Sequence, residues 1–303
     1  MNVVEATFGD LIDRTLLQVQ APVERGASVV LGVSLDTTTT SFTLSSTTTT
    51  LSPTDIVEFA GELMLVSSKT DAASPEYTVS RGYFQTTAQA HSLGAVGQVN
   101  PQYTRKRVGE AIRRSFARLE ALGLPLVKTK ILSPYESVGI DPNRMVLSMP
   151  EDTRTVLSVR TTALYELPRW EFLDNLPTGD YGTGKVVRLP GKGLTDEHEF
   201  YVVYQVPYRW SQHPTAPVET DTILLPEGAE DLPCSYATAF LLSSREVSRT
   251  EIDRAEEWAR NEPLRGGGSS AGVNRAWQEF YRALDEARRL SPPPRRRPYF
   301  RRA

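Results

Sequence analysis

Residues 105–122 read RKRVGEAIRRSFARLEAL, and this stretch decides how the rest of the chain is divided. Its apolar residues recur every three or four positions, which is typical of one face of a helix. Gly123 and Pro125 follow and end the predicted helix. Because a lone helix cannot bury its apolar face, the pattern predicts partner helices elsewhere. The face consists of Val108, Ala111, Ile112, Phe116, Leu119 and Leu122.

Two further amphipathic segments lie near the end of the sequence. The first begins at Tyr236 and can run to Asn261, before Pro263. The second covers residues 273–290, after a glycine-rich link, and ends before three prolines. We therefore predict a discontinuous helical bundle formed by residues 105–124 and 229–290. The face predicted for the last helix consists of Val273, Trp277, Phe280, Tyr281, Leu284 and Ala287.

The remaining sequence indicates β structure. Before the first helix, a short amphipathic segment at residues 8–17 is followed by runs rich in β-branched residues, which predict strands at 29–31, 41–44, 62–66 and 77–80. Two runs of four threonines, at 37–40 and 47–50, favour exposed turns and strand edges over a disordered stalk. Between the helices, no helix-length pattern interrupts the predicted strands at 145–147, 155–159, 185–189 and 199–206. Short strands with Pro, Gly and Asn turns predict an antiparallel sandwich or barrel.

The predicted fold class is thus α+β: a discontinuous helical bundle with an N-terminal β-rich region and an inserted antiparallel β-sandwich or barrel. The expected parts are an N-terminal β-rich domain (1–104), the first helix of the helical domain (105–124), an inserted β domain (125–228), the remaining helices (229–290) and a Pro/Arg-rich C-terminal arm (291–303).

Charge is unevenly distributed along the chain. The 303 residues have a net charge of -3, and without the five arginines of the arm the rest carries -8. The cations of the first predicted helix fit either a solvated face or a surface for acidic neighbours or DNA. Cys234 is the only cysteine, which excludes an intramolecular disulfide and a multi-thiolate metal site. With no run of eighteen apolar residues, no membrane span is expected.

Residues 179–185 match the spacing of a phosphate-binding loop, with glycines at 179 and 184 followed by Lys185. Such a loop also needs a Ser or Thr for Mg²⁺ and a following helix. Here Val186 occupies the hydroxyl position, and the continuation reads as a strand. A hairpin turn is the better interpretation, and a nucleotide hydrolase using Lys185 is the weakest of our functional hypotheses.

Other reactive residues lack partners in the sequence. Cys234 lies at a predicted helix start and fits a small buried residue better than a nucleophile. His198 lies among acidic residues, which indicates a charged turn rather than a metal site. The adjacent acids at 151–152 and 256–257 point in different directions and do not resemble an acid/base pair. We therefore expect no catalytic residues, no cofactor and no metal, and so no enzyme.

Residues 77–91, read as YTVSRGYFQTTAQAH, resemble the V-x-R-G-Y-x-x-T-T-A-x-x-H segment of virion proteins of actinobacteriophages. The segment fits a strand that ends in a turn at Arg81–Gly82, with threonine hydroxyls and His91 tying a loop back. As in those proteins, a Gly-Ala turn, a short strand and a helix follow. The block at 225–231 and the helices after it are similar to head-to-tail connector (adaptor) proteins of long-tailed phages. Residues 126–226 resemble no family that we can name.

The resemblance implies a structural virion protein of the particle's neck, assembled in the host cytoplasm. It implies a homo-oligomeric ring, of twelve copies, between the portal protein and a tail-proximal neck or tail terminator protein, around the DNA channel and close to genomic DNA. An arginine-rich arm stiffened by proline can pair with carboxylates or phosphates. The residues expected to bind the portal or a neighbouring subunit are Arg295, Arg296, Arg297, Tyr299, Phe300, Arg301 and Arg302.

A second hypothesis comes from the aromatic residues of the inserted β domain. Trp170, Tyr181, Tyr208 and Trp210 either belong to the core or form a binding face. The latter would fit a baseplate or tail-associated protein that binds a host receptor or glycan. Binding of glycans by this region would separate this hypothesis from the adaptor ring.

Overall fold

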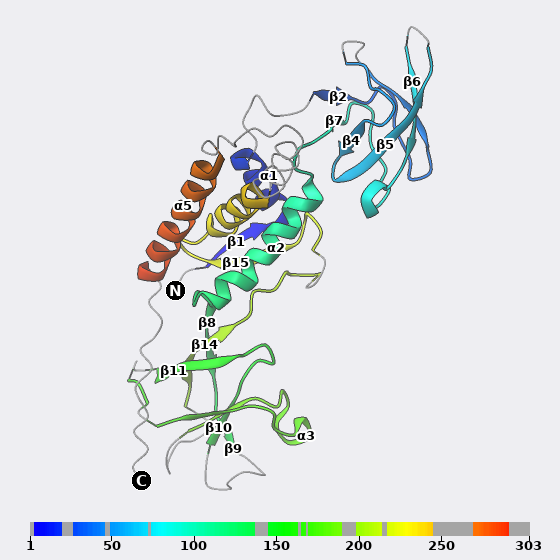
Figure 1. The fold of residues 1–303 in the computed structure, drawn as a ribbon. Helices are drawn as coiled ribbons and strands as arrows, with labels where there is room; N and C mark the ends of the chain where they lie inside the picture. The colour runs from blue at the N-terminus through cyan, green and yellow to red at the C-terminus, as the bar shows by residue number, and fades with distance from the viewer. Residues whose placement is uncertain are drawn as a thin grey trace. The chain divides into compact units, whose positions relative to one another are not determined.

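The chain folds into a mixture of helices and antiparallel sheets, seen here in a computed structural model (Figure 1). The structure describes residues 3–19, 27–45, 49–71, 74–136, 145–162, 165–167, 169–189, 198–213, 217–244 and 269–290. Two compact units can be distinguished, and each is built from distant parts of the sequence. One, here called the barrel unit, comprises Gly9–Arg114 and Pro233–Phe280; the other, the sandwich unit, comprises Met1–Phe8, Ser115–Leu232 and Tyr281–Ala303.

The barrel unit contains a six-stranded antiparallel sheet that curls on itself. Its order is β2 (Ser28–Val30), β7 (Val96–Val99), β4 (Ile56–Phe59), β5 (Glu62–Lys69), β6 (Glu76–Ser80) and β3 (Ser41–Thr43). The two outer strands meet, because the N–H of Gly32 donates to Thr43 O at 2.8 Å and that of Ser45 donates to Val30 O at 2.9 Å. The curl leaves no open edge between β2 and β3. Its interior is filled by buried side chains, among them Leu31, Phe42, Leu51, Phe59, Met64 and Tyr77.

The four strands predicted here at 29–31, 41–44, 62–66 and 77–80 are confirmed as β2, β3, β5 and β6. Their bounds agree within one residue, except that β5 continues three residues beyond the predicted end. The short strand implied by the resemblance after Gly94–Ala95 is β7. Strand β4 was not predicted. It forms a hairpin with β5 through Ala60 and Gly61, whose φ angles of 46° and 85° suit a two-residue hairpin turn. The first threonine run is a bend, not a strand edge: Asp36 Oδ1 accepts the N–H groups of Thr38 and Thr39. Part of the second run lies outside the described residues.

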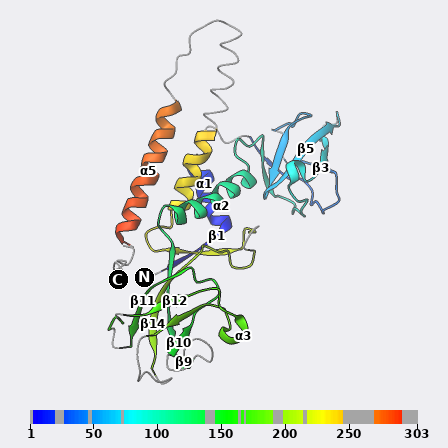
Figure 2. The same cartoon turned by 60° about the horizontal axis from the view of Figure 1, so that its bottom comes forward.

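Helices complete the barrel unit. They are α1 (Phe8–Val19), the first part of α2 (Arg105–Ala121), a helix at 232–244 and the first part of α5 (Ser269–Leu290). The helix at 232–244 contacts α1 through Cys234 Sγ, 3.5 Å from Leu11 O. It contacts α5 through Tyr236, whose ring centroid lies 5.5 Å from that of Trp277. Figure 2 shows α5 alongside this helix.

The amphipathic helices are confirmed, with corrections at their ends. Helix α2 agrees with the prediction, and Val108, Ile112 and Leu119 are fully buried. Helix α5 begins at Ser269, four residues earlier than expected. Its apolar face is narrower than predicted, since Tyr281 is 44% exposed. The predicted continuation from 245 to 261 lies outside the described residues.

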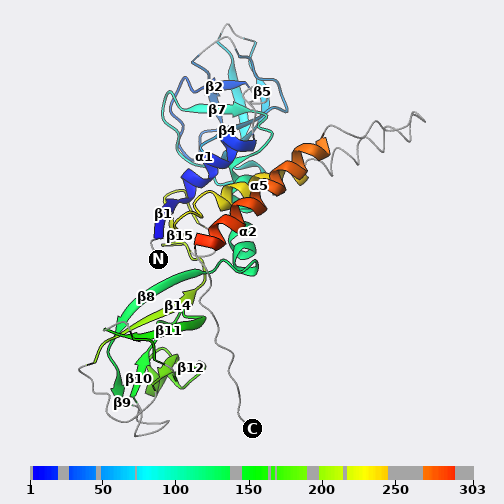
Figure 3. The same ribbon diagram turned by 90° about the vertical axis from the view of Figure 1, so that its left-hand side faces the viewer.

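The sandwich unit contains two antiparallel sheets (Figure 3). One has the order β11 (Thr155–Thr161), β14 (Phe200–Val206), β8 (Leu126–Leu132); the other has β12 (Glu171–Leu173), β13 (Val186–Arg188), β10 (Met145–Ser148), β9 (Tyr135–Glu136). Both contribute to one hydrophobic core, for example Leu147 and Val187 from one sheet and Val159 and Phe200 from the other. This is the packing of a sandwich, one of the two antiparallel arrangements that the strand pattern predicted.

A two-stranded ribbon also belongs to the sandwich unit. Strand β1 (Val3–Thr7) pairs antiparallel with β15 (Thr222–Pro226), from Val3 opposite Pro226 to Thr7 opposite Thr222. Neither strand was predicted. The turn after β15 holds Gly228 (φ 80°), where a Cβ atom would come within 2.7 Å of the Leu290 side chain at the end of α5. This places the end of α5 against the end of the ribbon.

None of the described helices combines the length and the apolar character that a membrane crossing requires.

Candidate interaction site

The segment from Arg81 to His91, singled out in the sequence, forms a loop at one side of the barrel-unit sheet. It begins where β6 ends, and Gly82 has a φ of 63°, a left-handed conformation that glycine adopts without strain. It ends at His91, which pairs with Leu35 through two backbone hydrogen bonds of 2.8 and 2.9 Å. The predicted turn at Arg81–Gly82 is therefore confirmed.

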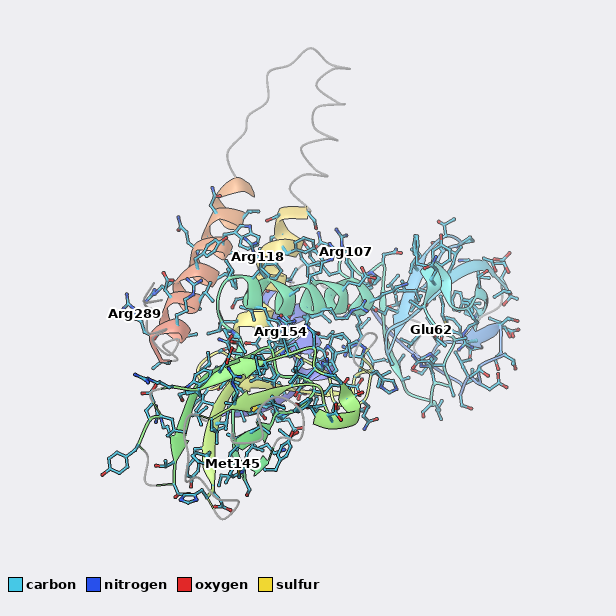
Figure 4. The ribbon with its side chains drawn as sticks, turned by 90° about the horizontal axis from the view of Figure 1, so that it is seen from below. Glu62, Arg107, Arg118, Met145, Arg154 and Arg289 are labelled. Atoms are coloured by element: carbon cyan, nitrogen blue, oxygen red, sulfur yellow. The ribbon has the colours of Figure 1, made fainter. Side chains whose placement is uncertain are left out.

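One buried carboxylate holds both ends of this loop. Glu62, the first residue of β5, is fully buried in the sheet (Figure 4). Arg81 donates to it from Nε at 2.6 Å and from Nη2 at 2.8 Å, a bidentate pair. Further donors are the N–H of Gln89 at 2.9 Å, the N–H of Gly82 at 3.2 Å and Nε2 of His91 at 2.9 Å. Five donors thus converge on one side chain, which compensates the removal of its charge from water.

Burial by itself would raise the pKa of Glu62, yet its pKa lies below the ordinary value. The cause is the set of donors, led by the guanidinium of Arg81, which favours the charged form. Arg81 also ties the loop to other chain segments, because Nη1 donates to the carbonyls of Asp36 and Thr39, both at 2.8 Å, and Nη2 donates to that of Gln89. The cluster of Glu62, Arg81 and His91 is therefore a structural fastening.

Of the two threonines in this segment, Thr86 behaves as predicted. Thr86 Oγ1 donates to Tyr83 O at 2.9 Å and accepts the N–H of Leu63 at 3.0 Å, which ties the loop to β5. The role of Glu62 was not predicted. A usable signal was a carboxylate opening the apolar run 62–66, because such a residue is expensive to bury unless it is paired.

The tip of the loop carries backbone strain and an exposed aromatic ring. Phe84 and Gln85 have φ angles of 51° and 61°, a conformation that non-glycine residues rarely adopt. The tip is held from α2, because Lys106 Nζ donates to Phe84 O at 2.8 Å and to Gln85 O at 3.2 Å. The Phe84 side chain nevertheless remains 63% exposed. Strained residues that persist in this way concentrate at functional sites.

Several cations of α2 have partners within the barrel unit. Besides Lys106, Arg105 forms an ion pair with Asp13. Arg107 donates to Ser244 Oγ at 2.9 Å, and the guanidinium of Arg114 lies 5.3 Å from the centre of the Phe240 ring. Figure 4 shows Arg107 on α2. These contacts favour a packing role for this side of the helix over a DNA-binding face.

The glycine-rich segment at 179–185 does not have the geometry of a phosphate-binding loop. It lies between β12 and β13, which are antiparallel neighbours, so the segment is the connection of a hairpin, as predicted. A short helix, α3 (Thr178–Tyr181), precedes the second glycine, and strand β13 rather than a helix follows Lys185. Lys185 Nζ donates to Thr153 O at 2.6 Å. The lysine thus ties the hairpin to a neighbouring loop.

The other reactive residues have structural environments. Cys234 is fully buried, and burial raises the pKa of its thiol, as expected for a packing residue. His213, for which no partner was predicted, lies with Nδ1 3.0 Å from Oδ2 of the buried Asp221. Two of the acids beside His198 lie outside the described residues, as do the acids at 256–257. Within the described part of the chain, no group of three His, Cys, Asp or Glu side chains could hold a metal ion.

The aromatic residues of the inserted β domain are mostly in its interior. Tyr181 and Trp210 are buried, and Trp170 and Tyr208 pack against the sandwich core. The hydroxyl of Tyr208 donates to Leu124 O at 2.8 Å, and burial raises the pKa of this phenol. Their positions fit the interpretation as core residues better than that as a binding face.

All seven arm residues expected to bind a partner, from Arg295 to Arg302, lie outside the described residues. The chain matches no known protein family, and no curated protein matches it in sequence.

Proposed function

We propose that this chain is a structural protein of a tailed bacteriophage, a head-to-tail adaptor that works as a ring between the portal and the tail. The ring consists of twelve copies around the DNA channel. The C-terminal arm binds the portal protein or a neighbouring copy, and the opposite side of the ring receives a tail-proximal neck or tail terminator protein. The protein is thus part of the neck of the virion and acts by shape and adhesion, without catalysis.

The observation that carries the proposal is the structural role of residues 77–91, the segment that resembles virion proteins. Arg81, Thr86 and His91, its most distinctive polar residues, all contribute hydrogen bonds that fasten a loop to the sheet. A segment whose polar residues serve this purpose specifies a shape and not a reaction. That is what a building component requires, because rings depend on rigid, reproducible surfaces.

The helices give secondary support. The part of α2 in the barrel unit contacts the helix at 232–244 through Arg107 and Arg114, and that helix contacts α5 through Tyr236. Segments far apart in sequence thus pack together, as the discontinuous bundle of 105–124 with 229–290 supposes. The bundle of an adaptor is the interpretation that we favour for this packing.

The alternative, a baseplate or tail-associated protein that binds a host receptor or glycan, receives less support. It was motivated by aromatic residues of the β domain, and the structure buries Tyr181 and Trp210. A receptor-binding face needs such rings exposed.

The proposal is tested on purified virions. Antibodies against the full chain, with electron microscopy of the labelled particles, should decorate the vertex where head and tail join. Label at the baseplate would favour the alternative instead. Absence of the chain from virions would reject both.

A further inference from the structure

We infer that Glu62 is a proton-sensitive pin: when its carboxylate loses its charge, the Arg81–His91 loop leaves the sheet, and Lys106 passes the release on to the first turn of α2. The residues involved all belong to the barrel unit, and the inference does not rest on the proposed function. Three contacts carry it. One joins the sheet to the loop, one joins the loop to α2, and one joins α2 to the sheet.

The first contact is the buried carboxylate of Glu62. Its Oε1 accepts Nε of Arg81 and the N–H of Gly82, and its Oε2 accepts Nη2 of Arg81, the N–H of Gln89 and Nε2 of His91. All of these partners are donors, so the O–H of a protonated carboxyl group would face another donor at either oxygen. The same protonation removes the charge that compensates the buried guanidinium of Arg81. Loss of the charge therefore breaks the fastening of the loop.

A second carboxylate, that of Asp36, adjoins the cluster, because Nη1 of Arg81 donates to Asp36 O at 2.8 Å. Hydrogen bonds from Thr39 and Thr38 hold the pKa of Asp36 well below its usual range. Asp36 therefore keeps its charge at pH values where an ordinary carboxylate is protonated. Acidification thus acts on the fastening through Glu62 and not through Asp36.

The range of pH over which the pin is lost follows from Glu62 and His91. Burial by itself would raise the pKa of Glu62, but its donors, led by Arg81, bring the pKa below the ordinary 4.5. The charged form therefore holds at neutral pH and is lost as the pH falls below 4.5 towards the lowered pKa. Nε2 of His91 can donate from the neutral and from the protonated ring, so a change in the charge of His91 does not remove its bond.

The second contact joins the tip of the loop to α2. Nζ of Lys106 donates to Phe84 O at 2.8 Å and to Gln85 O at 3.2 Å. Both tip residues are held in the left-handed region, with φ angles of 51° and 61°. A loop that leaves the sheet relaxes this strain, which favours the open loop once the pin is lost. Lys106 loses these two acceptors at the same moment.

The third contact runs from the start of α2 back to the sheet. Oε1 of Glu58 on β4 accepts the N–H of Arg105 at 2.7 Å, and Thr104 Oγ1 accepts that of Arg107 at 3.2 Å. The register of β4 with β5 places Glu58 and Glu62 on opposite faces of their hairpin. The hairpin thus holds the loop with one carboxylate and the start of α2 with the other.

The charge of the first turn explains why α2 responds to the loop. This turn holds three cations, at residues 105–107, and no acid. Cations are unfavourable there, because the N-terminal end of a helix carries a partial positive charge. In the closed loop, the carbonyls of Phe84 and Gln85 offset this cost at Lys106. When the loop leaves, the compensation is lost and the first turn opens more often, while the apolar core of the sheet stays closed.

Hydrogen exchange of the full chain at neutral pH, followed by mass spectrometry, tests the release. Glu62→Gln imitates the protonated pin, because its amide has nearly the same shape, no charge and an N–H donor. We expect peptides covering 83–90 to exchange about a hundredfold faster than in the wild type, and those covering 104–108 about tenfold faster. Low concentrations of urea should leave both rates unchanged, because a local opening exposes little surface. Glu76→Gln, at an exposed position of β6, is the control and should change neither rate.

A second pair of variants tests the transmission to α2. Lys106→Met keeps an unbranched side chain and removes the ammonium group. In this background, Glu62→Gln should still open the loop but should no longer accelerate exchange at 104–108. Lys69→Met removes an exposed ammonium group of β5 and is the matched control. In that background, Glu62→Gln should accelerate both regions as in the unmodified chain.

Acidification of the wild type gives the same test without a substitution, and it decides the matter if Glu62→Gln does not fold. With exchange corrected for the intrinsic effect of pH, the loop and the start of α2 should lose protection together below pH 4.5, before β5 does. A loop that stays protected in acid overturns the pin. A loop that opens while 104–108 stays protected overturns the transmission by Lys106. Simultaneous, urea-dependent loss of protection in the loop and β5 means global unfolding and overturns the local device.

Discussion

At the scale of single residues, the barrel unit depends on a charged side chain in its interior. Glu62 is fully buried and receives donors from Arg81, Gly82, Gln89 and His91. A carboxylate in this position destabilises a fold if it is unpaired and organises it if every oxygen is satisfied. Here both carboxylate oxygens of Glu62 accept hydrogen bonds. Because the donors come from both ends of the loop between Arg81 and His91, the same bonds fix the loop at both ends.

We expect Glu62→Gln to lower the free energy of unfolding by about 3–5 kcal/mol, because it leaves the buried guanidinium of Arg81 without its counter-charge. The measurement is urea unfolding followed by tryptophan fluorescence or circular dichroism. Glu76→Gln is the control, since Glu76 is exposed and should change the stability by less than about 0.5 kcal/mol. Equal stability of the two variants would contradict the role assigned to Glu62.

The same residue predicts a dependence on pH. The pKa of Glu62 is lower in the folded chain than its ordinary value of 4.5. Ionised Glu62 therefore stabilises the folded state more than protonated Glu62 does. This contribution is complete above pH 4.5 and is lost as the pH falls towards the lowered pKa. The stability of the wild type should therefore decrease on acidification, and the difference between wild type and Glu62→Gln should shrink. A constant difference from pH 7 to pH 3 would exclude this explanation.

Strain at the loop tip gives a prediction with the opposite sign. Gln85 has a φ of 61°, which glycine adopts freely. We expect Gln85→Gly to raise the free energy of unfolding by up to about 1 kcal/mol, since the relief of strain exceeds the added entropy of the unfolded chain. Urea unfolding measures the difference. A clear loss of stability would mean that the tip is not strained.

At the scale of elements, the packing of β4 against β7 in the curled sheet depends on a glycine at residue 97. Gly97 on β7 lies opposite Phe59 on β4, and a Cβ atom at residue 97 would come within 2.5–2.8 Å of the Phe59 ring. The ring thus covers the backbone of its neighbour strand. Glycine at this position is a requirement of packing, because its φ is not in the left-handed region.

We therefore expect Gly97→Ala to destabilise the protein by about 1–3 kcal/mol through overpacking. Gly272→Ala in α5 is the control, since nothing lies within 4 Å of its Cβ position and alanine is the better helix residue. That variant should be neutral or slightly more stable. Thermal unfolding of both proteins measures the contrast, and equal melting temperatures would show that the Phe59 ring moves aside.

At the scale of the whole molecule, chain segments from both ends of the sequence meet. Strand β1 pairs with β15, more than two hundred residues later, and Cys234 contacts Leu11. Contacts of such separation form slowly, because the chain loses entropy before they contribute stability. Strand β1, from the start of the sequence, thus completes the sandwich unit, and the helix at 232–244 completes the barrel unit.

Unlike these segments, the C-terminal arm is expected to contribute to binding and not to the stability of the fold. Deletion of residues 291–303 should leave the melting temperature unchanged, because the buried core residues described for the two units are all kept in the shortened chain. It should weaken binding to the portal protein, since the five arginines are lost. Binding to purified portal rings measures the second effect. A deleted chain that no longer folds as a soluble monomer would contradict the prediction.

Local sequence was sufficient for much of the fold. The helical spacing of Val108, Ile112 and Phe116, the alternation in β14 and the turn at Arg81–Gly82 were all readable, because each depends on residues within one or two turns of chain. The strands that were missed are β1, β4, β8, β9, β12 and β15. Strand β4 is hidden because a two-residue turn joins it to β5, whereas β1 and β15 are stable only as partners of each other.

Tertiary structure alone decided what these elements do together. Arg81 and His91 lie 19 and 29 residues from Glu62 in sequence, and only the pairing of β5 with β6 and the return of the loop bring the three side chains together. The partners of the α2 cations and the exposure of Phe84 depend in the same way on strand register and helix contacts. Periodicity determines which face of an element is apolar, whereas the choice of its partner depends on packing over the whole chain.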